Sequence, residues 1–229
     1  MPTTELHRTL PSLLDFDATI TGVGQLDDGT TVIELDRSAF YARSGGQAGD
    51  HGLFVIGSGE LIVTDTRYSP DRETVWHHLA PGHDPKPEVG AAVEAQVDAE
   101  RRQRLTTGHT AQHLAYLASV MALGPRPWAG GIIDIDNIRV DIAHASNEGG
   151  IDPNAVLDAY RVLIDADLEI RRWADAQHAA TWWWAIDAHE PIGCGGTHLD
   201  STRGASVLEP TIKRKGSKNA VIKLVPAAP

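Results

Sequence analysis

Short alternating runs of apolar and polar residues dominate the first hundred positions of the chain. Residues 18–26 and 30–36 flank Asp27-Asp28-Gly29, residues 53–57 and 60–66 flank Ser58-Gly59, and residues 88–98 alternate in the same way. Apolar side chains at every second position, separated by turn residues, indicate half-buried antiparallel strands. We therefore expect a β-rich, barrel-like domain over residues 1–98.

From Glu100 onward the spacing of apolar residues changes from two to about four. One stripe along residues 100–123 consists of Leu105, His109, His113, Leu117 and Met121. That spacing predicts an amphipathic helix with this stripe, including both histidines, directed to the core. Asp152 and Pro153 then form an N-cap and first-turn pair, which predicts a second helix through about Arg172.

Strand-like segments follow each of the two predicted helices. They cover residues 132–142, interpreted as two strands, and residues 180–187, 206–214 and 220–225. We expect these segments and the helices to form an α+β domain over residues 99–229. The fold class predicted for the whole chain is α+β.

Residues 40–52, with the sequence FYARSGGQAGDHG, contain too much glycine for a regular element. We expect a shaped loop, in which Asp50 hydrogen-bonds to backbone amides. Trp182, Trp183 and Trp184 are consecutive in a predicted strand, so at least one should pack in the core, although a base-stacking platform is an alternative. His77 and His78 are interpreted as structural or exposed.

Composition limits the class of protein further. The chain has 229 residues, of which 41% are hydrophobic, and no apolar run approaches the roughly 20 residues that cross a bilayer. Its start lacks the features of a signal peptide, so we expect a cytoplasmic protein with no membrane partner. The formal net charge of −11 argues against non-specific binding to nucleic acid.

The single cysteine excludes an intramolecular disulfide and draws attention to its surroundings. Cys194 and His198 are four residues apart in CGGTH, and the HTAQH segment spaces His109 and His113 so that both project from one helix face. One thiolate and three imidazoles form a ligand set for tetrahedral Zn²⁺. The alternatives are a buried apolar cysteine and hydrogen-bonded histidines. Because Thr110 follows His109, the HExxH motif of zinc proteases is absent.

The motifs HTAQH (109–113), CGGTH (194–198) and SGGQAGDHG (44–52), in this order, resemble the editing domain of alanyl-tRNA synthetase and its freestanding relatives, the AlaX family. Residues 136–142 and 214–224 agree with that family, and the resemblance spans roughly residues 20–225. It implies a barrel-like N-terminal part followed by the α+β domain that threonyl- and alanyl-tRNA synthetases share. It also implies no aminoacylation, since no adenylation core is recognisable.

The activity implied by the resemblance is hydrolysis, in trans, of serine and often glycine wrongly attached to tRNA(Ala). The zinc ligands of the family fall on His109, His113, Cys194 and His198, and Gln47 matches an active-site glutamine. We take Gln47 and Thr110 as the candidate catalytic residues. Departures from the family pattern at four positions bear on substrate preference and tRNA contact: Ala42, Arg43, Gly193 and Ala220.

Discrimination of serine from alanine requires groups that hydrogen-bond to the seryl hydroxyl. The candidates for this contact are Gln47, Thr110 and Thr197. An acidic protein still binds tRNA if it presents a local basic surface, for which the candidates are Arg101, Arg102, Lys213, Lys215 and Lys218. DNA is not an expected partner. The competing hypothesis is a zinc-binding module that keeps the editing fold without deacylating tRNA and acts as a binding or regulatory protein.

Overall fold

The computed structural model describes residues 2–82, 86–144, 150–178 and 181–227, and the chain divides into two compact units. Met1–Ser44 and Ala48–Gln103 form the first unit, whereas Gly45–Gln47 and Arg104–Pro229 form the second. The first unit contains a closed barrel and the second contains helices packed with sheets. The predicted α+β class is confirmed.

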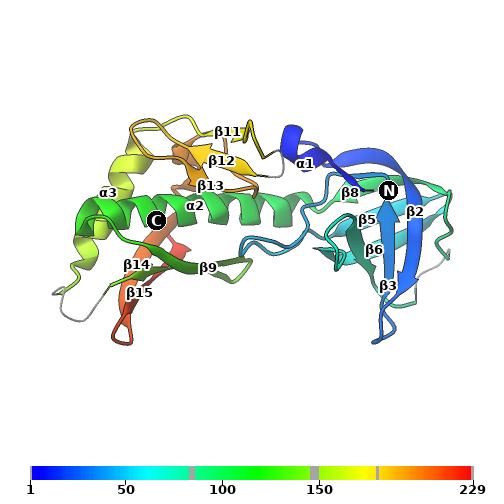
Figure 1. The fold of residues 1–229 in the computed structure, drawn as a ribbon, viewed down its shortest axis with the longest axis horizontal. Helices are drawn as coiled ribbons and strands as arrows, with labels where there is room; N and C mark the ends of the chain where they lie inside the picture. Colours follow the sequence, from blue (N-terminus) through cyan, green and yellow to red (C-terminus); the bar gives the residue numbers. More distant parts are fainter. Residues whose placement is uncertain (1, 83–85, 145–149, 179–180, 228–229) are drawn as a thin grey trace. The chain divides into compact units, whose positions relative to one another are not determined.

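Six antiparallel strands of the first unit close the barrel in the order β2-β3-β7-β6-β5-β8 (Figure 1). In β8 every second residue is buried, as the alternation predicts. A short parallel pair, β1 with β4, and the one-turn helix α1 accompany the barrel. The bounds are β1 (Thr4–Glu5), α1 (Leu6–Thr9), β2 (Asp15–Gln25), β3 (Thr31–Leu35), β4 (Arg37–Ser38), β5 (Gly52–Ile56), β6 (Gly59–Tyr68), β7 (Val75–Leu79) and β8 (Ala92–Val97).

The barrel interior holds a polar side chain among aromatic rings. His77, on β7, is fully buried, and its ring lies edge-on to Phe40 and Phe54, each with centroids 5.2 Å away. Its Nδ1 lies 3.0 Å from the carbonyl oxygen of Ile33, which can only accept, so Nδ1 carries the proton. Nε2 then accepts a hydrogen bond from the Ser38 hydroxyl at 2.9 Å.

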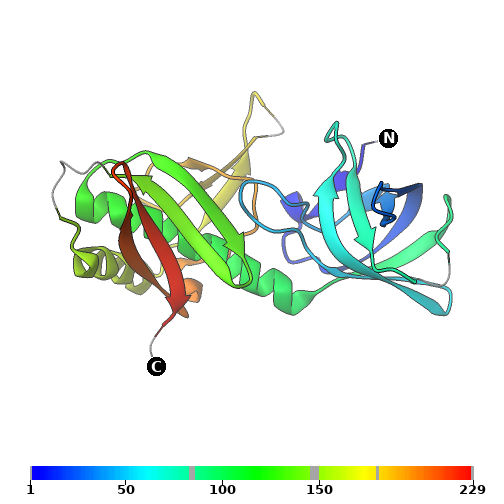
Figure 2. The ribbon, with the colours of Figure 1, turned by 90° about the horizontal axis from the view of Figure 1, so that it is seen from below.

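In the second unit, the long helix α2 (Ala99–Leu123) lies between two sheets (Figures 1 and 2). One sheet has four antiparallel strands in the order β14-β15-β10-β9, and the other has three in the order β11-β12-β13. Helix α3 packs against β14. The bounds are β9 (Trp128–Asp134), β10 (Asn137–Ala143), α3 (Pro153–Asp165), β11 (Arg171–Ala174), β12 (Trp182–Ala185), β13 (Ile192–Gly193), the 3-10 helix η2 (Thr202–Ala205), β14 (Leu208–Lys215) and β15 (Asn219–Pro226).

The structure corrects three details of the expected elements. Strand β7 was not predicted. Met121 is 46% exposed, because each step of four residues advances about 40° beyond a full turn, and the stripe from Leu105 has rotated by about 160°. Helix α3 begins as expected, with the Asp152 carboxylate accepting from the amide of Asn154, but it ends at Asp165 instead of near residue 172. Asp167 has a positive φ of 48°, which takes the chain out of the helix.

No helix among the described residues combines the length and the apolar character needed to cross a membrane.

Candidate metal centre and its surroundings

Four side chains from two separate elements of the second unit converge on one point. His109 and His113 project from α2, while Cys194 and His198 belong to the loop that follows β13. The ligating atoms of the four residues lie within 4.8 Å of one another, and the sulfur of Cys194 is 3.4 Å from Nε2 of His109 and 3.2 Å from Nε2 of His198. These residues could hold a metal ion.

Burial sets the protonation of the cluster in the absence of a metal. Removal from water lowers the pKa of all three imidazoles, to about 3 for His113 and well below the ordinary value for His109 and His198. Repulsion within the cluster and from Arg172 lowers the pKa values of His109 and His198 further. The imidazoles are therefore neutral at pH 7, as ligands must be. Burial also raises the pKa of the Cys194 thiol to about 11.

Gln47 fixes the tautomer of one histidine. The backbone amide of Thr197 can only donate, and it lies 3.2 Å from Oε1 of Gln47, which assigns that atom as oxygen. The same oxygen is 2.7 Å from Nδ1 of His109, so Nδ1 carries the proton and donates it. Nε2 of His109 is left with a free lone pair toward Cys194, as expected of a supporting contact that orients a metal ligand.

Thr110 has a similar relation to His198. Its hydroxyl oxygen accepts from the backbone amide of Leu199 at 3.0 Å and lies 3.2 Å from Nδ1 of His198. Nδ1 of His113, in contrast, is buried and has no hydrogen-bond partner among the described residues.

Two tryptophans line the apolar side of the cluster. Trp184, on β12, is fully buried, with its ring centroid 4.8 Å from that of His113, and Trp128, on β9, is 5.7 Å from the same ring. Trp184 therefore packs in the core, as expected for at least one of the three consecutive tryptophans. The contact of Trp128 was not foreseen, because nothing in its local sequence connects it with His113.

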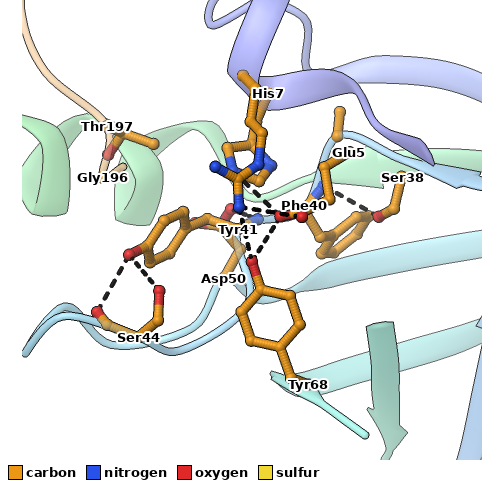
Figure 3. Close-up of polar contacts among 12 residues, drawn as sticks. Glu5, His7, Ser38, Phe40, Tyr41, Ser44, Asp50, Tyr68, Gly196 and Thr197 are labelled. Carbon is orange, nitrogen blue, oxygen red and sulfur yellow. Dashed lines mark hydrogen bonds and ion pairs between the residues drawn. The ribbon is translucent and has the colours of Figure 1, made fainter. Parts of the chain in front are cut away.

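The glycine-rich loop is divided between the two units. In the first unit, the Tyr41 hydroxyl bonds to Ser44, and the carboxylate of Asp50 accepts from the backbone amide of Tyr41 at 2.6 Å (Figure 3). In the second unit, Gly46 has a φ of +88° and its carbonyl accepts from the amide of Ile133 at 2.8 Å. This bond lies beside an isolated parallel bridge that joins Gln47 to Ile133, on β9.

The basic residues singled out from the sequence occupy different environments. Arg102 is only 4% exposed, and its guanidinium pairs with the carboxylate of Asp50 and donates to the carbonyl of Ala39. This buried pairing argues against the expectation that Arg102 contacts tRNA. Arg101 is partly buried and donates to the carbonyl of Gly49. The three lysines at the β14–β15 hairpin are exposed: Lys213, Lys215 and Lys218.

The four departures from the family pattern lie in well-defined places. Ala42 and Ala220 are fully buried, whereas Arg43 is exposed and lies 3.7 Å from the carboxylate of Asp65. Gly193 pairs with Trp183 across strands β13 and β12.

Comparison with known proteins gives consistent matches. Residues 5–101 match the family described as "tRNA synthetases class II (A)". The chain is 36% identical to the alanine–tRNA ligase of Archaeoglobus fulgidus over an alignment that covers 99% of this chain and 26% of the ligase. It is 31% identical to that of Methanopyrus kandleri, with 82% of this chain and 22% of the ligase covered. The match to the Cupriavidus necator ligase is 40% identical over half of this chain and 13% of that protein. The chain thus spans about a quarter or less of these relatives.

Proposed function

Because the chain is a homologue of alanine–tRNA ligases over nearly its whole length, we propose that it hydrolyses the ester between tRNA(Ala) and a wrongly attached serine or glycine. The observation that carries this proposal is the convergence of HTAQH, CGGTH and Gln47 in one buried cluster. Such hydrolysis would take place in the cytoplasm, where tRNA is charged.

Zinc is the proposed metal. Zinc is bound tetrahedrally by cysteine sulfur and histidine nitrogen, as one thiolate and three imidazoles would provide, and in such a site the sulfur and a nitrogen are about 3.5 Å apart. The sulfur of Cys194 lies 3.4 Å and 3.2 Å from two of the histidine nitrogens, which is close to that separation. When bound, zinc polarises a carbonyl group or activates water, provided that a coordination position opens for it.

The side chains around the cluster have separate roles in this proposal. Gln47 and Thr110 hold His109 and His198 in the orientation that ligation requires. The amide of Gln47 also donates to Thr197, so its place beside the metal residues is fixed by three contacts. The proposed tRNA contacts are Arg101 and the exposed lysines Lys213, Lys215 and Lys218. Arg102 is not one of them, because it is buried and paired with Asp50.

Deacylation of Ser-tRNA(Ala), Gly-tRNA(Ala) and Ala-tRNA(Ala) by the wild-type protein tests the proposal. We expect release of serine and glycine and little release of alanine. Cys194→Ala and His198→Ala should lose most of this activity together with the zinc. His178→Ala is the matched control, because His178 is an exposed histidine of the same unit and should behave as wild type.

Two outcomes would contradict the proposal. If the protein bound one equivalent of zinc but released no serine at concentrations near those of the tRNA, a binding or regulatory module would be the better description. A zinc content below about half an equivalent per chain would contradict the proposed metal site.

A further inference from the structure

Thr197 has both of its lone pairs occupied by donors. Its hydroxyl oxygen accepts from Nε2 of Gln47 at 3.0 Å and from the hydroxyl of Thr106, on α2, at 2.8 Å. A hydroxyl has two lone pairs and one proton, so only the proton of Thr197 remains to be placed. Thr197 is 2% exposed, and no acceptor for this proton is found in the part of the chain that the structure describes.

Gln47 also has one donor hydrogen without an acceptor in the described part of the chain. Its Oε1 is used twice, by Nδ1 of His109 and by the amide of Thr197, and one hydrogen of Nε2 goes to Thr197. The second hydrogen of Nε2 has no acceptor among the described residues, although Gln47 is fully buried. A buried donor without an acceptor is costly in a folded protein, so each such group requires an explanation.

The Thr197 hydroxyl and the second N–H of the Gln47 amide are both donors without an acceptor among the described residues, and they lie beside the four residues that could hold a metal. Gln47 contacts His109 directly, and Thr197 precedes His198 in the chain. Neither group has an acceptor position left for a ligand. An approaching hydroxyl needs an acceptor for its own proton as well as a donor, whereas a carbonyl oxygen or an oxyanion only accepts.

We propose that the Thr197 hydroxyl and the second Nε2 hydrogen of Gln47 are the donors that bind the carbonyl oxygen of the aminoacyl ester and the oxyanion formed from it. This inference rests on the proposed ester hydrolysis. Thr106 is a positioning residue, since it touches no substrate and acts by filling a lone pair of Thr197, which turns the Thr197 proton toward the substrate.

The reaction balances with water as the only co-reactant. Water adds to the ester carbon and loses a proton, and the C=O electron pair moves to the oxygen held by Gln47 and Thr197. When that pair returns, the bond to the ribose oxygen breaks and the ribose oxygen takes up a proton. The products are a free amino acid and a tRNA with a free terminal hydroxyl.

This assignment differs from the expectation that Gln47 and Thr197 recognise the seryl hydroxyl. Donors to the carbonyl oxygen act on every aminoacyl ester alike, so they raise the rate without selecting serine. Loss of the Thr197 hydroxyl should therefore lower kcat equally on seryl and glycyl substrates. A partner of the seryl hydroxyl would instead affect the seryl substrate alone.

The test compares Thr197→Val and Thr197→Ser on Ser-tRNA(Ala) and Gly-tRNA(Ala), with zinc content measured for each protein. We expect Thr197→Val to lower kcat about 100-fold to 1000-fold on both substrates, with KM and zinc content unchanged, as removal of one oxyanion donor does elsewhere. Thr197→Ser should keep most of the activity. Thr181→Val is the control, because Thr181 is an exposed threonine of the same unit and lies outside the proposed metal site and tRNA contacts.

Thr106 is tested by the same kinetics. Thr106→Val should lower kcat about tenfold on both substrates without changing KM. Thr106→Ser keeps the hydroxyl and should have a kcat close to that of wild type. A second measurement does not require turnover. Calorimetry should show that Thr197→Val weakens binding of an RNA minihelix carrying a phosphonate analogue of the tetrahedral intermediate, but not of the uncharged minihelix.

The inference is overturned if Thr197→Val keeps the wild-type kcat, if it loses activity on Ser-tRNA(Ala) alone, or if it loses zinc in proportion to activity. Each of these results leaves the proposed function standing, because the wild-type protein is active in all of them. A wild-type protein that hydrolyses neither substrate overturns the inference and the proposed function together.

Discussion

Gly196 lies where the CGGTH loop packs tightly against a histidine of α2. A Cβ placed on Gly196 would overlap the imidazole ring of His109 and would lie 2.8 Å from Oε1 of Gln47. Any side chain there must displace His109 or Gln47, which orients it. The glycine is thus required by a close approach, whereas Gly193, the last residue of β13, has only Trp183 at 3.9 Å near the corresponding position.

We predict that Gly196→Ala loses zinc and deacylase activity, since His109 can no longer occupy its observed position. The steric conflict should also lower the free energy of unfolding by about 1–3 kcal/mol. Gly193→Ala is the matched control and should retain both zinc and activity. Metal content by atomic absorption and urea unfolding provide the measurements. A full equivalent of zinc in Gly196→Ala would contradict the prediction, because it would mean that the loop can shift to accommodate the added methyl group.

The sequence predicted which side chains cluster at the candidate metal site better than it predicted what each neighbouring residue does there. His109, His113, Cys194 and His198 were found because each pair is local in sequence, and the structure brings the pairs together. The role of Gln47 as an acceptor for His109 depends on a contact across 62 residues, and that of Thr106 on a contact across 91. No local pattern encodes such contacts.

Strand β7 was not predicted from the sequence, although it is one of the six strands that close the barrel. In its sequence, VWHHL, His77 stands between Val75 and Leu79 on the face where a strand pattern would have an apolar residue, so alternation gave no signal. The histidine that faces the barrel interior is nevertheless buried, because Ser38 and Ile33 satisfy both of its nitrogens. The helix α2 was predicted well, since its pattern is long, while the end of α3 was not, because Asp167 carries no sequence signal for its positive φ.

Burial of His77 makes the barrel sensitive to acid. Removal from water lowers the pKa of this imidazole from 6.5 to about 4. Above pH 6.5 the ring is neutral in both the folded and the unfolded chain, and its full contribution to stability is present. As the pH falls from 6.5 toward 4, only the unfolded chain binds the proton, so folding loses about 3 kcal/mol over this range.

Urea unfolding between pH 7 and pH 4 measures this loss. His77→Gln should be less stable at pH 7, because it loses packing against Phe40 and Phe54, but its stability should fall by about 3 kcal/mol less over the acid range than that of wild type. His178→Gln replaces an exposed histidine and should follow the wild-type curve. Parallel curves for wild type and His77→Gln would contradict the prediction.

For the whole molecule, the net charge of −11 requires that any tRNA contact be local. The four-stranded sheet supplies such a place. Lys213, Lys215 and Lys223 are exposed along β14 and β15, and Arg139, opposite Lys223, is partly exposed on β10. Of the acidic residues on these strands, Asp141 is paired with Arg139 and Lys215, and Glu209 is paired with Arg161.

A local basic surface on an acidic protein predicts modest affinity for tRNA with a strong dependence on salt. Lys213→Gln should reduce the slope of log affinity against log salt concentration by about one, since one fewer phosphate is neutralised. Lys86→Gln removes the same charge from an exposed position in the first unit and should leave the slope unchanged. Filter binding of uncharged tRNA(Ala) over a salt series makes the comparison. Equal slopes for both variants would exclude Lys213 from the contact.

Residues Gly45–Gln47 belong to the second unit, although the residues before and after them in sequence belong to the first. This arrangement limits where the gene can be divided without separating residues that contact each other. A cut near residue 98 separates the barrel from the four residues that could hold a metal, but it leaves Gln47, the acceptor for Nδ1 of His109, on the barrel fragment. The part of the chain that holds the four clustered residues is therefore not a contiguous module that recombination could transfer by itself. Any rearrangement that preserves the site has to carry the barrel with it, which ties the inheritance of the two halves together.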